Sequence, residues 1–562
     1  MEQEYLIENF LTFFRSANDL PDDLLNEVLK HMPQEKIFQD VSRVSQSFRE
    51  VVNAYDLEMP CSRPIMNSEL FKKQFKPARN NMNLQGCIVN PDEDLPLYNA
   101  NFDLVLYWLK GKNDLKKLSL AKNHLKNESI KKLFDVLKDN PALTSLDLSS
   151  NKIDDENAIA LGKVLTRKEN KIKELSITVC GISAEGGKVL ATALWIASKW
   201  TNVGGIEPTS GRKLFEKKTD FSAEDLAIFK LGQLLPTDYI KLGDSYFQPS
   251  RSSVLTSLNL GRNNIGPEGA KAFADALRVN TVLIKLNLYG NSIKDDGAIA
   301  ICKSLQSNQN LQELDLGSNG IGPYGGEALA AVLSEVNAVL IKLNLYGNLI
   351  KDKGAVAISN SLQKNQSLRE LNLGSNGIAS DGANALAAAL SERSAVLTSL
   401  NLSSNDIGPE EAESFSDALK VNTVLTNINL SGNEVRDKGA IALGKALETN
   451  KTLKELSLDE CGIFSNGGKG LASALAKGKA VLIRLNLFGN FVGDAGAVAI
   501  GNHHLTHLHK VHHHCHHHNP LGLQEWCLVH FLVHHLARHH KVHHRQVFPR
   551  MFLPVHLRHP QT

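Results

Sequence analysis

The sequence has few of the features that mark secreted or membrane proteins. Its seven cysteines are scattered and include no C-x-x-C pair, so neither a disulfide framework nor a zinc knuckle is indicated. No run of about 18 apolar residues occurs, so no membrane-spanning helix is expected. The first residues, MEQEYLIENFLTFF, are acidic where a secretory signal would be basic. We therefore expect a cytoplasmic or nuclear protein without a membrane partner.

The sequence also lacks a strong charge of either sign. Lys plus Arg number 62 and Asp plus Glu number 60, which argues against electrostatic binding of the whole molecule to nucleic acid or anionic lipid. The exception is the segment after Asn502, which is basic and holds every histidine except His31 and His124. We interpret residues 502–562 as an unordered extension or the product of a shifted reading frame; a metal site in its HHHCHHH run is the weaker alternative.

Motifs for catalysis are missing as well. The sequence contains no G-x-x-x-x-G-K-[ST], H-E-x-x-H or G-x-S-x-G, which excludes these nucleotide-binding, metalloprotease and hydrolase signatures. Two histidines in the first 502 residues are too few for a histidine-based metal site or triad. We expect a protein that is not an enzyme and has no cofactor.

What the sequence does contain is a long internal repeat. The pattern L-x-x-L-x-L-x-x-N-x-I recurs every 28 or 29 residues outside one gap, and the segments 284–301 and 341–358 are nearly identical at a separation of 57. The Asn position of the pattern is occupied by Asn123, Asn151, Cys180, Asn263, Asn291, Asn319, Asn348, Asn376, Asn405, Asn433, Cys461 and Asn490.

Each repeat predicts one strand followed by one helix. Leucines alternate with polar residues in L-x-L, as in a short strand buried on one side. The Asn side chains are expected to bind backbone groups at the turn and to form a ladder between repeats. In 266–280, Ala270, Phe273, Ala274 and Leu277 share a helical face, Pro267 suits the first turn, and Asn280 suits the exit. The fold class is therefore an α/β solenoid with strands inside and helices outside.

This pattern resembles the ribonuclease-inhibitor type of leucine-rich repeat, in which Asn and Cys alternate at the ladder position. The resemblance covers residues 105–501 and implies a horseshoe with a protein-binding surface. The spacing of 83 residues between Cys180 and Asn263 breaks the period. We interpret residues 195–250 as an irregular insert in which 220–235 is the helical half of a degenerate repeat. Its aromatic residues either plug the interrupted stack or form a binding loop.

The residues before the solenoid predict a small helical unit. Apolar residues in 20–52 fall into three short amphipathic stretches, too small a unit to be stable alone. The domain boundaries that we predict are an N-terminal arm at 1–19, the three-helix unit at 20–60, a linker at 61–104, the solenoid at 105–501 and the tail at 502–562.

The three-helix unit resembles an F-box. Its opening Leu-Pro, the acidic and aliphatic residues after it and the second aliphatic pair match the family pattern, whereas Ser45 and Phe48 replace the usual Cys and Trp. The resemblance implies contact with a Skp adaptor through Leu20, Pro21, Leu24, Leu25, Val28, Leu29 and Phe48. It also implies a substrate receptor of an SCF-type cullin–RING ubiquitin ligase, with a protein target held by the repeats.

Two alternatives remain open from the sequence. One is a non-catalytic scaffold or a regulator of the small GTPase Ran, although the Ran regulator ends in an acidic tail and this chain ends in a basic one. The other concerns the source, because a bacterial effector secreted into a host cytosol could borrow the same ligase.

The predicted target-binding residues follow the inner strands. Lys285, Glu313, Lys342 and Glu370 precede the second leucine of successive repeats, so they become neighbours across the sheet, where they either meet a target or only pair with one another. Aromatic residues follow the strand where other repeats have Gly or Ser, and we expect them to be exposed anchors. The full predicted set is Lys285, Tyr289, Glu313, Asp315, Lys342, Tyr346, Glu370, Arg484 and Phe488.

Overall fold

The computed structural model describes most of the repeat region. The described residues are 81–85, 102, 105–106, 109–110, 114–137, 140, 142–165, 170–199, 254–335, 338–392, 395–477 and 481–493. The chain divides into two compact units, Met1–His512 and His513–Thr562, and all described residues belong to the first. The predicted F-box unit, most of the insert and the tail lie outside the described residues.

The strands form one parallel sheet of 13 members in the order of the sequence. Each strand has three residues, and neighbours pair in a constant register such as Lys285↔Glu313 and Glu313↔Lys342. The strands are β1 (Asn81–Asn83), β2 (Lys117–Ser119), β3 (Ser145–Asp147), β4 (Glu174–Ser176), β5 (Ser257–Asn259), β6 (Lys285–Asn287), β7 (Glu313–Asp315), β8 (Lys342–Asn344), β9 (Glu370–Asn372), β10 (Ser399–Asn401), β11 (Asn427–Asn429), β12 (Glu455–Ser457) and β13 (Arg484–Asn486).

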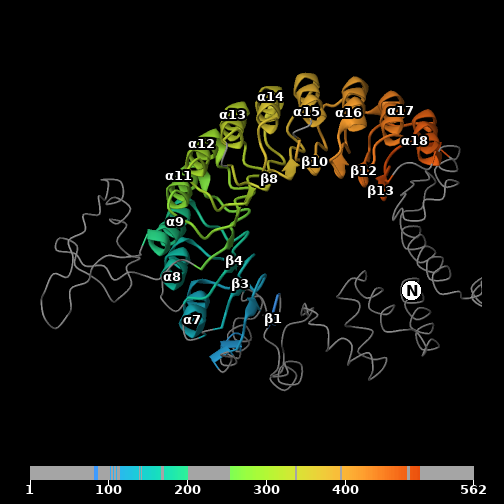
Figure 1. Ribbon diagram of the computed structural model, residues 1–562. Coiled ribbons are helices and arrows are strands. Elements are labelled where there is room, and N and C mark those ends of the chain that lie inside the picture. Colours follow the sequence, from blue (N-terminus) through green and yellow to red (C-terminus); the bar gives the residue numbers. More distant parts are fainter. Residues whose placement is uncertain are drawn as a thin grey trace, which may run out of the picture. The chain divides into compact units, whose positions relative to one another are not determined.

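The helices form the second layer. In Figure 1 they lie on the outer side of the curved sheet and the strands line its inner, concave side. They are α7 (Asn127–Leu137), α8 (Asp155–Leu165), α9 (Ala184–Lys199), α11 (Gly266–Leu277), α12 (Lys294–Leu305), α13 (Pro323–Leu333), α14 (Lys351–Leu362), α15 (Ser380–Ser391), α16 (Pro409–Val421), α17 (Arg436–Leu447) and α18 (Ser465–Ala476). The predicted α/β leucine-rich-repeat solenoid is confirmed. No helix in the described part of the chain is long and apolar enough to span a membrane.

The core lies between the two layers. Leu286 of β6 is buried and Lys285 beside it is exposed, as the alternation of leucine and polar residues predicts. In α11 the predicted face of Ala270, Phe273 and Leu277 is buried. The same set of leucine, isoleucine and alanine positions is buried in repeat after repeat, and together they form one continuous hydrophobic core.

The ladder of Asn side chains is present and satisfies the turn after each strand. Asn319 is buried, donates from Nδ2 to the carbonyl of Leu288 at 2.9 Å, and accepts the backbone N–H groups of Asn291 and Ile293 at 2.8 and 3.3 Å. At the Cys positions the thiol makes only the donor contact, as from Cys461 Sγ to the carbonyl of Leu430 at 3.2 Å. Each rung therefore bonds one repeat to the preceding one.

A second series of asparagines, at the helix exits, connects the outer layer. Asn308 donates to the carbonyls of Leu277 and Asn280 in the preceding repeat at 2.7 and 2.9 Å. Its Oδ1 accepts the backbone N–H of Leu311 at 2.9 Å, which closes the turn into the next strand. We predicted the position of Asn280 at the helix exit, but not that its counterparts bond neighbouring repeats.

Two of the predicted boundaries differ from the structure. Strand β1 falls inside the predicted linker at 61–104 and pairs with β2, so the sheet begins at Asn81 and not at 105. Strand β4 pairs directly with β5, so no strand of a further repeat lies between them in the sheet, and α9 continues to Lys199 into the range predicted as insert. The predicted helical half of a degenerate repeat, 220–235, lies outside the described residues.

Candidate protein-binding surface

The concave side of the sheet holds most of the predicted target-binding residues. A shallow hollow of about 520 Å³ runs across strands β5 to β10, from Ser257 to Asn401. It is lined by the residues of these strands, and the polar side chains on either side of each buried leucine belong to its lining. Seven of the nine predicted residues belong to β6–β9 or follow these strands. Five of them line the hollow, namely Lys285, Glu313, Asp315, Lys342 and Glu370, whereas Tyr289 and Tyr346 lie in the turns after β6 and β8 and are not among its lining residues.

The charged residues of this face pair with one another. Nζ of Lys285 lies 3.0 Å from a carboxylate oxygen of Glu313, and Nζ of Lys342 lies 2.8 Å from Glu370. The hydrogen bond that Lys342 donates to Glu370 raises the pKa of Lys342 above its ordinary value; burial opposes this shift, and the charges of Glu370 and Glu313 add smaller contributions that raise it. Exposed pairs of this kind contribute about 0.5 kcal/mol or less each. The charged row of Lys285, Glu313, Lys342 and Glu370 therefore forms its ion pairs within the protein. Its part in target binding stays a prediction.

The third position of every central strand except β7 carries a side-chain amide. Oδ1 of Asn287 accepts the backbone N–H of Tyr289 at 2.8 Å, and Asn372 and Asn401 accept N–H groups two residues later at 3.0 and 2.9 Å. These bonds fix the amide planes, so that each NH₂ group remains as a hydrogen-bond donor on the concave side. We did not predict this row from the sequence, because an asparagine at an exposed strand position does not stand out from other polar residues.

Asp315 interrupts the amide row. Its carboxylate accepts the backbone N–H of Gly317 at 2.9 Å. Burial raises the pKa of Asp315 above its ordinary value, and the bonds from Gly317 and the amide of Asn344 oppose that shift. The group is therefore a hydrogen-bonded part of the face and not an isolated charge.

The predicted aromatic anchors are half-buried and not fully exposed. A Cβ atom on Gly317 would lie 2.7 Å from Cδ2 of Tyr289, and one on Gly374 would lie 2.9 Å from Cδ2 of Tyr346. Each ring thus lies over the glycine of the next repeat, and the Arg262 guanidinium stacks 5.6 Å from the Tyr289 centroid. Glycine follows each tyrosine by one repeat, and this pairing is the signal that sequence analysis overlooked.

Arg484 and Phe488 lie apart from the other predicted residues. They belong to β13 and the turn after it, four strands beyond β9 in the sheet order. Arg484 forms an ion pair with Glu455 of the preceding strand, and Phe488 is half-buried. The structure therefore does not place these two residues in the hollow.

Some exposed apolar residues were not predicted. Phe464 and Phe491 are each 54% exposed and stack with ring centroids 5.4 Å apart at 18°. Val179 is 49% exposed and has a positive φ of 54°, which is unfavourable for a β-branched residue. A comparison of equivalent repeat positions would have identified them, since small or polar residues occupy most of these positions.

The described cysteines carry no reactive chemistry. Burial raises the pKa of Cys180 to about 11 and those of Cys302 and Cys461 to about 12, and none forms a disulfide. Thiols of this kind are protonated and weakly nucleophilic at neutral pH. Among the described residues no group of three or more His, Cys, Asp or Glu side chains could hold a metal ion.

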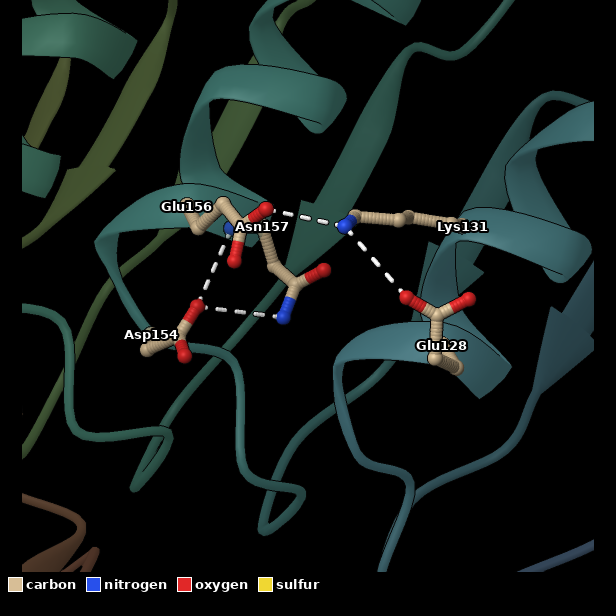
Figure 2. Close-up of polar contacts among 5 residues, drawn as sticks. All are labelled: Glu128, Lys131, Asp154, Glu156 and Asn157. Carbon is tan, nitrogen blue, oxygen red and sulfur yellow. Dashed lines mark hydrogen bonds and ion pairs between the residues drawn. The ribbon is translucent and has the colours of Figure 1, made fainter.

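The outer surface of the first described repeats carries polar contacts that connect helices. Figure 2 shows Lys131 of α7 between Glu128 of its own helix, at 3.5 Å, and Glu156 of α8, at 2.8 Å. Oδ1 of Asp154 accepts the backbone N–H of Asn157 at 3.1 Å and so caps the start of α8. These contacts stabilise the arrangement of helices and are far from the concave face.

Known family models match both the predicted N-terminal helical unit and the repeat region of the chain. Residues 18–58 match the F-box domain model. A leucine-rich-repeat model matches residues 139–162, 251–274, 279–302, 307–330, 364–387, 393–416, 421–444, 449–472 and 480–501. Strand–helix units such as β4–α9 and β8–α14 complete the array outside these matches.

The curated relatives are much longer than this chain. NACHT, LRR and PYD domains-containing protein 5 of Homo sapiens is 26% identical over 283 residues, which are 50% of this chain and 21% of that protein. Protein 14 of the same series, from Mus musculus, is 29% identical over 172 residues, or 29% of this chain and 17% of its own length. The chain thus spans about a fifth of the length of these relatives.

Solved structures include distant repeat proteins. An internalin from Listeria monocytogenes is 18% identical with a TM-score of 0.37 and covers 70% of this chain and 79% of its own. The complex of Rad7 and Elc1 in yeast contains a chain 15% identical with a TM-score of 0.33, covering 72% of this chain and 93% of that one. Scores this low carry no argument about function. The family matches and the observed solenoid thus show a chain that combines a match to the F-box domain with leucine-rich repeats.

Proposed function

We propose that the protein is a substrate-recognition adaptor of an SCF-type cullin–RING ubiquitin ligase. One observation carries this proposal: the same chain contains an F-box sequence and a solenoid whose concave face is polar and has a shallow hollow. The F-box residues led by Leu20, Pro21 and Leu24 bind the Skp adaptor. The concave face binds a protein target, with no nucleic acid or membrane partner, in the cytoplasm or nucleus.

In this proposal the chain performs no bond chemistry. It holds a target lysine near the charged ubiquitin-conjugating enzyme and so raises the effective concentration of that lysine. The pairing of Lys285 with Glu313 and of Lys342 with Glu370 fits such a role, because these charged side chains have partners when the target is absent.

The adaptor function is tested by co-purification of the Skp–cullin pair. We expect the triple variant Leu20→Ala, Pro21→Ala, Leu24→Ala to lose the pair, since it removes apolar contact area at the F-box. A matched control is Glu410→Ala, Glu413→Ala, Lys438→Ala, which removes an exposed ion-pair cluster between α16 and α17. Undiminished binding by the F-box variant contradicts the proposal.

The target-binding function needs a variant that changes the face without unfolding it. Exchanging the signs in the row (Lys285→Glu, Glu313→Lys, Lys342→Glu, Glu370→Lys) keeps both ion pairs and the net charge. We expect the proteins captured by the wild type to be lost while Skp binding and the melting temperature are retained. Capture of the same proteins by the exchanged variant would show that the row only pairs with itself.

A further inference from the structure

The central part of the concave face repeats every two strands and not every strand. Lys285 and Lys342 occupy equivalent positions on β6 and β8, as do Tyr289 and Tyr346 after these strands. Adjacent strands are about 4.8 Å apart, so equivalent groups two strands apart are separated by about 9.6 Å. A ligand that lies along the face would therefore contact the same pair of side chains, a lysine and a tyrosine, about every 9.6 Å.

Among regular chain conformations, polyproline II matches this interval best. It advances about 9.3 Å in a turn of three residues. Two turns of an α-helix advance about 10.8 Å, and two residues of an extended strand advance about 6.8 Å. A polyproline II segment along the face thus drifts by about 0.3 Å per period, which keeps it in register across the two tyrosines.

The two tyrosines form aromatic ridges suited to such a segment. Each ring is held over the glycine of the next repeat, Tyr289 over Gly317 and Tyr346 over Gly374, so its position is set before a ligand arrives. Arg262 contacts the Tyr289 ring and supports it further. Grooves lined by aromatic residues bind proline-rich polyproline II ligands because the rigid ligand loses little conformational entropy.

The hydrogen-bonding groups of the face are complementary to this ligand. Polyproline II has no internal hydrogen bonds, so its carbonyl groups accept from outside donors. The amides of Asn287, Asn372 and Asn401 use Oδ1 for backbone N–H groups, which leaves their NH₂ groups as donors. A proline residue has a backbone carbonyl but no N–H group, so it can accept hydrogen bonds but not donate them. The NH₂ donors of these asparagines can therefore bond the carbonyl groups of a proline-rich segment.

The charges of the face favour a ligand without strong net charge. Lys285 and Lys342 are already paired with Glu313 and Glu370, so a strongly acidic or basic segment would have to break these pairs. We propose that the target segment bound by the concave face between β5 and β10 is a proline-rich chain in the polyproline II conformation, with its axis across the strands. This inference rests on the proposed target-binding role and names the class of segment recognised there.

The test uses the full-length protein and a fluorescent 12-residue oligoproline, followed by anisotropy. We expect saturable binding, weakened about fivefold by Tyr289→Ala or Tyr346→Ala and at least about tenfold by the double variant. The matched control is Tyr324→Ala on α13, because Tyr324 is 64% exposed and contacts Lys353 on the helical side. That variant is expected to bind as the wild type does.

Three outcomes would overturn the inference. The first is absence of binding up to about 1 mM peptide, the second is unchanged binding by the double variant, and the third is equally tight binding of a Gly-Ser or a helix-forming 12-mer. Circular dichroism and Skp co-purification of each variant show whether it is folded. If oligoproline fails to bind while sign exchange in the charged row still abolishes target capture, the adaptor proposal stands and only the ligand class is wrong.

Discussion

The carboxylate of Asp352, in the first turn of α14, caps the following helix α15 by accepting the backbone N–H of Gly382 at 3.0 Å. The same Oδ1 accepts the N–H of Ala379 at 2.7 Å. Asp295 caps α13 and Asp437 caps α18 in the same way. One repeat supplies the aspartate and the next supplies a glycine close to it, which gives a physical reason for the period of two repeats.

We expect Asp352→Ala to destabilise the α14–α15 region by about 1 kcal/mol, because two N–H groups at the start of α15 lose their acceptor. Gly382→Ala should also destabilise it, since the new Cβ would lie 2.7 Å from the Asp352 carboxylate oxygen. Hydrogen exchange of α15 measures both effects locally. When Asp352 is already Ala, the further destabilisation caused by Gly382→Ala should be smaller than in the wild type. Fully additive destabilisation in the double variant would contradict the predicted clash between the new Cβ and Asp352.

Removal of an asparagine of the ladder should lower the free energy of unfolding more than removal of a helix-capping aspartate does. Asn319→Ala leaves the N–H groups of Asn291 and Ile293 and the carbonyl of Leu288 without this partner in a buried turn. We expect a loss of about 3 kcal/mol in urea denaturation. Asn319→Cys is the matched comparison, since a thiol still donates at the equivalent positions. Equal stabilities of the Ala and Cys variants would contradict this account of the rung.

Val179 offers a substitution that should stabilise the protein. Its φ of 54° is costly for a β-branched side chain, and the exposed side chain contributes little packing. Relief of about 1 to 2 kcal/mol of backbone strain outweighs the greater entropy that glycine adds to the unfolded chain, about 0.5 to 1 kcal/mol. We expect Val179→Gly to gain about 0.5 to 1 kcal/mol in urea denaturation.

The matched comparison for this substitution is Val481→Gly, where the valine is exposed to a similar degree without a positive φ. That variant should lose stability or leave it unchanged. If both glycine variants shift the denaturation midpoint equally, strain at Val179 does not explain the effect.

The raised pKa values of the buried thiols predict a lower free energy of unfolding at alkaline pH. Burial raises the pKa of Cys302 from 9.0 to about 12, so between these values the unfolded chain releases a proton that the folded chain keeps. Stability is complete below about pH 9 and falls by up to about 1.4 kcal/mol per pH unit for each such thiol as the pH rises toward 12. Urea denaturation at pH 8 and pH 10 should show a shallower decline for Cys302→Ala than for wild type. Parallel declines would contradict the prediction.

The tail supplies a prediction about the end of the solenoid. A repeat array needs a terminal cap with a polar outer face. The sequence after residue 502 contains no further L-x-x-L-x-L strand, and from the sequence we expected a fold continuous from about Leu115 to Gly501. Deleting residues 503–562 should change the melting temperature by about a degree or less, because an unordered segment buries little surface. A large decrease would identify the segment as a genuine cap.

The sequence by itself determined the repeat and its two layers. Leucine at alternate positions requires a strand with one buried side, and the helical spacing of apolar residues that follows requires a helix on that side, so both elements could be predicted without knowledge of neighbouring repeats. The same holds for the Asn ladder, because a buried turn needs a side chain that can satisfy backbone groups. The charged row of β6–β9 followed from the constant register of parallel strands.

Only the tertiary structure decided what depends on contacts between repeats. Tyr289 is half-buried because Gly317, one repeat later, leaves room for its ring, and neither residue alone indicates this. Strand β1 joins the sheet although its segment lacks most of the leucine pattern, since pairing with β2 and burial of Leu84 replace the missing signal. The direct pairing of β4 with β5 likewise depends on the geometry of the stack, because hydrogen bonds between strands join residues by their position in space and not by their separation along the chain.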